Sequence, residues 1–146
     1  GASVGSLIFG YISEILRSRK KALYLGTGSL ALFFASYFFL FGISETLFYV
    51  IIAAMGLSMG GLWAVFMANA SEQFGTNVRA TVTTTAPNFV RGTTVLVSMS
   101  IASLMSFYGL WSAGLIVGVI CILISLISIF YSEEAYGKEL DYVEED

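Results

Sequence analysis

One arginine stands within a long apolar stretch whose polar side chains recur at helical spacing. Between 80 and 108 the polar residues follow one another every three or four positions, so they share one face of a helix. Arg91 lies in this face twelve residues after Arg79, which is about 18 Å along a helix axis. If lipid surrounds the helix, a charge at that depth costs at least about 2.5 kcal/mol. The polar stripe consists of Thr81, Thr84, Asn88, Arg91, Thr94 and Ser98.

The planar guanidinium of Arg91 suits a carboxylate or a phosphate. Two roles are open for it: solute binding or gating, with Asn88 as a hydrogen bonder, or pairing with an acid on a helix outside this chain. Pro87 cannot donate to the carbonyl of Thr83, so we expect a local bend, either in a cavity-lining segment or as a tolerated kink. Trp63 is a candidate wall of the same cavity, with ordinary packing as the alternative.

The elements that must position these residues are predicted from composition. The 146 residues are 57% hydrophobic and only 12% charged, whereas roughly a quarter of a soluble domain is charged. We therefore expect an all-α fold, a multi-pass transmembrane helical bundle over 1–131, followed by an acidic cytoplasmic C-terminal tail over 132–146. Four mostly apolar runs exceed the roughly 20 residues that cross a bilayer, and a fifth is shorter. The predicted helices cover 1–16 (partial), 22–43, 46–71, 80–108 and 111–131.

The charges of the predicted loops set an orientation. Alternating helices place every loop cation on one side of the membrane and none on the other, which by the positive-inside rule is the cytoplasmic side. We therefore expect the C-terminus to be cytoplasmic too, in an integral protein of a bacterial inner or plasma membrane. The six cations are Arg17, Arg19, Lys20, Lys21 and Arg79 in the loops and Lys138 in the tail.

Several classes of function are disfavoured by the residues that the chain lacks. It has no histidine and a single cysteine, Cys121, within an apolar run. The commonest general base and the commonest zinc ligand are therefore missing. We expect no enzyme activity, no metal, no cofactor and no nucleic-acid partner.

The first apolar run is too short to span a bilayer. From Gly1 to Ser13 it would extend only about 20 Å as a helix, against a hydrocarbon core of roughly 30 Å. The chain also opens on Gly1 rather than on methionine. We therefore expect it to be a fragment that lacks an N-terminal part.

Two predicted cytoplasmic loops resemble motifs of one transporter family. Residues 10–21, GYISEILRSRKK, resemble the loop signature of the major facilitator superfamily, in which an acid follows a glycine by four residues and a basic turn comes next. Here Glu14 replaces the usual aspartate, and Arg17 or Ser18 occupies the position of the usual turn glycine. Residues 72–79, EQFGTNVR, resemble the acid, six residues, arginine pattern of sugar-porter-like members.

The resemblance implies the C-terminal half of such a carrier, with the five segments as the eighth to twelfth of twelve helices. It implies secondary active transport of a small polar solute by alternating access, with the missing N-terminal half as partner. The solute would be sugar-like from the loop motif or an organic anion from Arg91. Symporter-like coupling to protons is the corresponding expectation, although no membrane-embedded acid is seen in this chain.

The loop charges are candidates for a cytoplasmic latch. Glu72 would pair with Arg19 or Arg17, and Glu14 with Arg79, in ion pairs that break and re-form between conformations. The alternative is solvated loop charges worth at most about 1 kcal/mol per pair. A rival to transport as a whole is a non-transporting membrane interaction module, a degenerate half-carrier.

Overall fold

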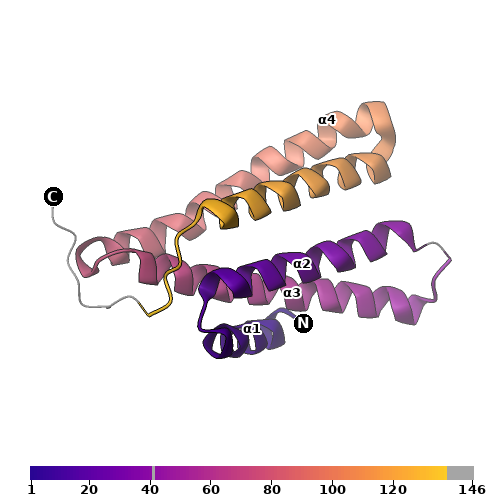
Figure 1. Ribbon diagram of the computed structural model, residues 1–146. Helices are drawn as coiled ribbons and strands as arrows, with labels where there is room; N and C mark the ends of the chain where they lie inside the picture. Colours follow the sequence, from indigo (N-terminus) through magenta and orange to yellow (C-terminus); the bar gives the residue numbers. More distant parts are fainter. Residues whose placement is uncertain (41, 138–146) are drawn as a thin grey trace.

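The computed structural model describes residues 1–40 and 42–137, and this part of the chain is almost entirely helical (Figure 1). The prediction of an all-α fold is confirmed, since the described residues form four helices and no strand. The helices are α1 (Ala2–Leu16), α2 (Arg19–Phe39), α3 (Glu45–Gln73) and α4 (Thr76–Tyr131).

Three of these helices begin earlier than the uncharged runs predicted. The hydroxyl of Ser18 accepts a hydrogen bond from the backbone N–H of Lys21 at 3.1 Å, which caps α2 before its basic residues. Ser44 caps α3 in the same way through Leu47 at 3.3 Å. Uncharged runs therefore locate the part of each helix that suits lipid, while serine caps set where α2 and α3 start.

The longest helix, α4, reverses direction within its length. Gly109 has φ 78° and ψ 163°, angles that no α-helix contains, and Figure 1 shows the ribbon folding back into two arms. The arms cover 76–108 and 110–131, and the turn falls between the predicted segments 80–108 and 111–131. The two arms join without a longer loop and form one continuous element, so the described residues contain four helices. The predicted count of about five helices stays a prediction. The helix runs unbroken through Pro87.

Length and composition suit these helices to a bilayer. In the described part of the chain, α2, α3 and α4 are long and apolar enough to cross a membrane, and α1 is a shorter apolar helix. Large apolar side chains are widely exposed, among them Leu7 at 77% and Phe107 at 81%. Such surfaces are unusual on a soluble monomer. The fold therefore fits a membrane-embedded protein.

Glycines bring α1 and α3 into backbone contact. A Cβ atom on Gly5 would lie 1.9 Å from the carbonyl oxygen of Leu57, and one on Gly60 would lie 2.1 Å from that of Ala2. The hydroxyl of Ser6 also donates to the carbonyl of Gly60 at 3.1 Å. Small residues that let helices approach this closely are typical of membrane proteins. These contacts hold α1 closely against α3.

The buried core lies where α1, α2, α3 and the end of α4 meet. It contains Phe9, Leu23, Val65 and Ile129, one large apolar residue from each helix. The second arm of α4 thus joins the unit made by the first three helices. The first arm contributes only Pro87 to the buried residues of α4, so most of its surface is not covered by the other helices.

Candidate functional site

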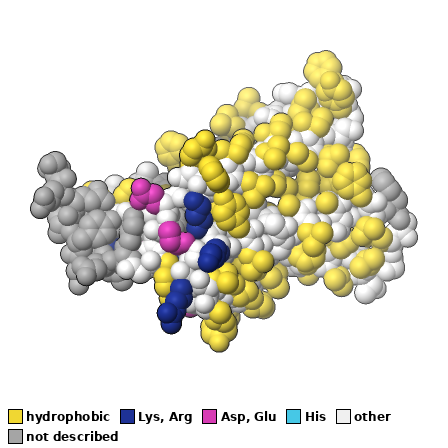
Figure 2. Space-filling model, in the orientation of Figure 1, with side chains coloured by type: hydrophobic (Ala, Val, Ile, Leu, Met, Phe, Trp, Pro, Cys, Tyr) yellow, Lys and Arg dark blue, Asp and Glu magenta, His cyan; other side chains and the backbone are white. Residues whose placement is uncertain are grey.

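Charged side chains gather at one end of the molecule, while apolar side chains cover most of the visible remainder (Figure 2). At that end α1 finishes, α2 starts, and α3 and α4 both finish. Hydrogen bonds and ion pairs connect these four ends. We call this group the Arg19 cluster, consisting of Ser13, Glu14, Ser18, Arg19, Glu72, Glu134 and Tyr136.

The centre of the cluster is a two-pronged ion pair between α2 and α3. Arg19 donates through Nε to Oε2 of Glu72 at 2.8 Å and through Nη2 to Oε1 at 2.5 Å. The two side chains are only 10% and 16% exposed. Two parallel charge-assisted bonds fix both distance and orientation, so this pair holds α2 and α3 in one relative position.

The same guanidinium also reaches α1. Its Nη1 lies 2.7 Å from Oε1 of Glu14 and donates to the hydroxyl of Ser13 at 2.8 Å. Its Cζ lies 5.1 Å from the centre of the Tyr136 ring, within the range of a cation–π interaction. Arg19 therefore joins three helices and the segment that follows α4.

Glu134 returns from beyond α4 to the start of α2. Its carboxylate accepts from the backbone N–H of Arg19 at 2.8 Å and from the hydroxyl of Ser18. Burial acts to raise the pKa of Glu134, but the hydrogen bonds from Ser18 and from backbone N–H groups outweigh it, so the pKa lies below its usual value. An anion at a helix N-terminus is also favoured by the helix dipole.

Lys20 makes the reciprocal contact at the end of α4. Its ammonium donates to the carbonyls of Phe130 at 2.7 Å and of Ser132 at 2.9 Å. A cation on the last carbonyls of a helix satisfies acceptors that have no partner within the helix. Two sets of hydrogen bonds, made by Glu134 and by Lys20, thus connect the start of α2 with the end of α4 and the segment after it.

The structure brings together only some of the residues predicted to form the latch. Glu72 pairs with Arg19, one of its two expected partners. Glu14 also pairs with Arg19, whereas the partner expected for it, Arg79, donates instead to the carbonyl of Phe74 at 3.0 and 3.2 Å. Arg17 lies exposed at the turn before α2. A latching role for these charges stays a prediction.

Sequence reasoning missed the other members of the cluster. Ser18 carried a signal, because a serine directly before a run of helix formers is a typical N-cap. Glu134 and Tyr136 carried none, because nothing in the pattern of the acidic tail indicates a contact with a distant helix. Of that tail, residues 138–146 lie outside the described part of the chain.

The second region is the first arm of α4, residues 76–108, which we call the polar arm. All six members of the predicted stripe are exposed on it. Nη1 of Arg91 donates to Oδ1 of Asn88 at 3.4 Å, and Nδ2 of Asn88 donates to the carbonyl of Thr84 at 3.0 Å. The hydroxyl of Thr84 donates in turn to the carbonyl of Ala80 at 2.8 Å. These bonds all stay within the arm.

The charge of Arg91 is not balanced by the described part of this chain. Both ion pairs found among the described residues belong to Arg19. Trp63, the third predicted solute contact, is 38% exposed on α3 and packs against Phe66 with ring centres 5.8 Å apart. Trp63 takes no part in the hydrogen bonds that connect Arg91 through Asn88 to Thr84.

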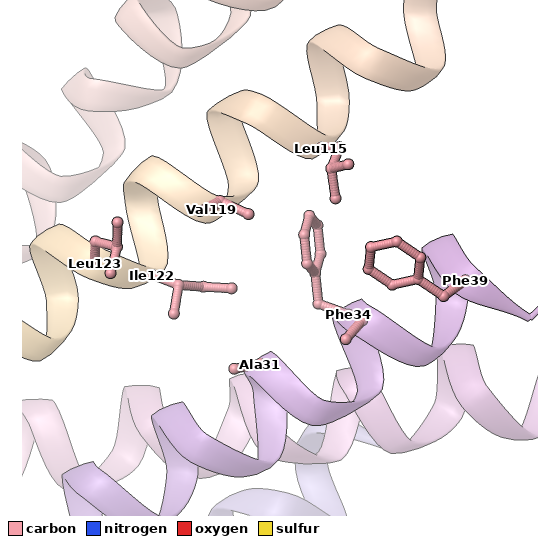
Figure 3. Close-up of a pocket in the computed structure, with 8 residues that line it drawn as sticks. Ala31, Phe34, Phe39, Leu115, Val119, Ile122 and Leu123 are labelled. Atoms are coloured by element: carbon pink, nitrogen blue, oxygen red, sulfur yellow. The ribbon is translucent and has the colours of Figure 1, made fainter.

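An open groove of about 190 Å³ lies elsewhere, between α2 and the second arm of α4. Figure 3 shows Phe34 pointing from α2 toward α4 and Ile122 pointing back toward α2. Every side chain that lines the groove is apolar, so the groove offers no hydrogen bond to a polar solute. The lining residues are Ala31, Phe34, Ala35, Phe39, Leu115, Val119, Ile122 and Leu123.

Metal ligands and known proteins give no further guide to the site. The described residues contain no group of three or more His, Cys, Asp or Glu side chains that could hold a metal ion. The Arg19 cluster and the polar arm therefore carry the functional interpretation. Comparison with protein-family models gave no match for this chain, and neither did comparisons with curated proteins or with solved structures.

Proposed function

We propose that this chain forms part of a secondary transporter that moves a small polar solute by alternating access. The two loop motifs resemble those of the C-terminal half of a major facilitator superfamily carrier, so the rest of the carrier would supply the other half of the solute site. The solute is sugar-like or an organic anion. The three apolar helices of membrane length fit the location that such a function requires.

The observation that carries this proposal is the exposed polar arm. An apolar helix that presents Arg91, Asn88 and Thr84 on one uncovered face is costly against lipid. A water-filled cavity between two helical bundles would remove that cost, because the polar side chains would be hydrated whenever no solute is bound. Arg91 and Asn88 then contact the solute or gate its path, and Trp63 is a candidate wall.

The Arg19 cluster would serve the conformational change. Its ion pairs hold the ends of α1, α2 and α3 in one arrangement. A carrier that rocks between two states needs bundles that move as units and contacts at helix ends that change between states. We assign the cluster to the cytoplasmic side by the positive-inside rule, in a multi-pass protein of a bacterial inner or plasma membrane whose C-terminus is cytoplasmic.

Uptake by cells that express the intact gene containing this sequence tests the proposal. Labelled carboxylates and sugars would be compared for wild type, Arg91→Ala and Lys21→Ala, the last removing an exposed cation from the start of α2. We expect Arg91→Ala to lower uptake at least about tenfold, because a lost charge-assisted hydrogen bond is worth about 1.5–3 kcal/mol. Lys21→Ala should transport normally.

Membrane insertion of each variant is measured alongside uptake. If Arg91→Ala is inserted and transports as wild type does, the role of Arg91 is wrong. If wild type moves none of the solutes, the alternative gains support, namely a membrane interaction module that transports nothing. The exposed polar arm would then be the surface that contacts another protein.

A further inference from the structure

We infer that the transported solute is an organic anion, held through a carboxylate or phosphate by the Nε–Nη2 edge of Arg91. This inference rests on the proposed transport function and selects one of its two solute classes. It follows from how the hydrogen-bond donors of the polar arm are used, from the geometry of Arg91, and from a comparison with Arg19.

Two neutral side chains of the polar stripe, Thr84 and Asn88, direct donors along the helix rather than away from it. The Thr84 hydroxyl donates to the carbonyl of Ala80 at 2.8 Å. One amide N–H of Asn88 donates to the carbonyl of Thr84 at 3.0 Å. A hydroxyl has a single proton to give, so Thr84 offers a solute only lone pairs in this arrangement.

Arg91 offers a solute more donors than either of these two side chains. A guanidinium carries five N–H donors in a rigid fork. Asn88 occupies Nη1 through its Oδ1, while Nε and Nη2 have no hydrogen-bond partner among the described residues. Since Nε and Nη2 point the same way, they present two parallel N–H groups on the edge away from Asn88.

Arg19, one of the four arginines of the chain, shows that edge holding a carboxylate. Arg19 uses the same two atoms, Nε and Nη2, to hold both oxygens of Glu72 at 2.8 and 2.5 Å. Arg91 presents the corresponding edge without a protein carboxylate among the described residues. An anionic solute would complete the same arrangement and compensate the charge, whereas a sugar hydroxyl would leave the charge uncompensated.

Ligand-induced thermal stabilisation of the intact purified carrier tests this inference. The probes are lactate, succinate and glycerol 3-phosphate, each beside a neutral counterpart: lactamide, succinamide and glycerol, with glucose as a sugar. The proteins are wild type, Arg91→Gln, Arg91→Lys and the control Lys21→Gln. A ligand that binds only the folded state raises the midpoint of unfolding.

We expect at least one anion, and no neutral counterpart, to raise the midpoint for wild type and Lys21→Gln. Arg91→Gln should bind that anion at least about tenfold more weakly, and Arg91→Lys should fall between, because lysine keeps the charge without the fork. Stabilisation by glucose or an amide but by no anion would overturn the inference and leave the transport function standing.

Two other results would also overturn it. No stabilisation of wild type by any probe, together with no uptake of any solute, would remove the transport function as well. Destabilisation of the unliganded carrier by Arg91→Gln, with anion binding unchanged, would show that Arg91 pairs with an acid elsewhere in the carrier. The selectivity of the wild-type protein for anions over neutral compounds is measured without any variant. The inference can therefore be tested even if a variant misfolds.

Discussion

Arg19 and Arg91 meet opposite surroundings in the same chain. Arg19 contacts two carboxylates, a serine hydroxyl and an aromatic ring, contributed by the end of α1, the end of α3 and the segment after α4. Arg91 contacts the described chain through one 3.4 Å bond to a residue three positions away. Where the chain folds onto itself the charge of Arg19 is compensated, whereas Arg91 has no carboxylate partner among the described residues.

Glycines repeat the contrast between the two regions. In the unit that carries the Arg19 cluster, Gly5 and Gly60 have backbone atoms of a neighbouring helix against them. On the polar arm, Gly92 has nothing within 4 Å of the position that a Cβ would take. The first region contains close backbone contacts between α1 and α3, whereas no such contact is made at Gly92 on the polar arm.

The largest effect on stability is expected from Arg19→Ala. Removing one partner of a buried, hydrogen-bonded ion pair is strongly destabilising, and here Glu72 would be left at 16% exposure. We expect a loss of about 3 kcal/mol in the free energy of unfolding, measured by denaturation in detergent micelles. Arg91→Ala should change the same quantity by less than about 0.5 kcal/mol, as exposed substitutions usually do. Equal losses would abolish the contrast between the two regions.

Gly5→Ala should have the next largest effect. The new Cβ would lie 1.9 Å from the carbonyl oxygen of Leu57, a backbone atom that cannot rotate away, so α1 and α3 must separate. Overpacking of this kind costs about 1–3 kcal/mol. Gly10 lies in the same helix with nothing within 4 Å, so Gly10→Ala should instead gain up to about 1 kcal/mol in unfolding free energy. Equal stability of the two variants would refute the backbone contact.

A smaller, pH-dependent effect is expected at Glu134. Its pKa is lowered in the folded protein, so the folded state favours the carboxylate and the stabilisation is fully present above the usual carboxyl pKa. It should be lost as the pH falls from 4.5 through the lower folded value. Because Glu134 is exposed, the difference between wild type and Glu134→Gln should be at most about 1 kcal/mol at pH 7. A difference unchanged at pH 3 would contradict this linkage.

The sequence predicted local features well and contacts between distant segments only partly. Uncharged runs located the apolar helices, and the shared side of two loops was enough to suggest the pairing of Glu72 with Arg19. The contact between Glu134 and Ser18 joins residues 116 positions apart, and an acidic tail has no periodic pattern that points to a partner. Glu14 was predicted to pair with Arg79 but pairs with Arg19. A loop motif predicts the side of the membrane on which a charge lies, and not its distance from each cation.

The smallest effect should come from the turn that carries the latch motif. Arg17 ends α1 with φ 46° and ψ 40°, and its N–H bonds to the carbonyl of Glu14 at 3.2 Å. This left-handed conformation costs a residue with a Cβ about 1–2 kcal/mol, and glycine adopts it freely but loses more chain entropy on folding. Arg17→Gly should therefore raise the free energy of unfolding by about 0.5 kcal/mol. Arg17→Ala removes the same charge but keeps the Cβ, so an equal gain in that variant would attribute the effect to charge rather than to backbone strain.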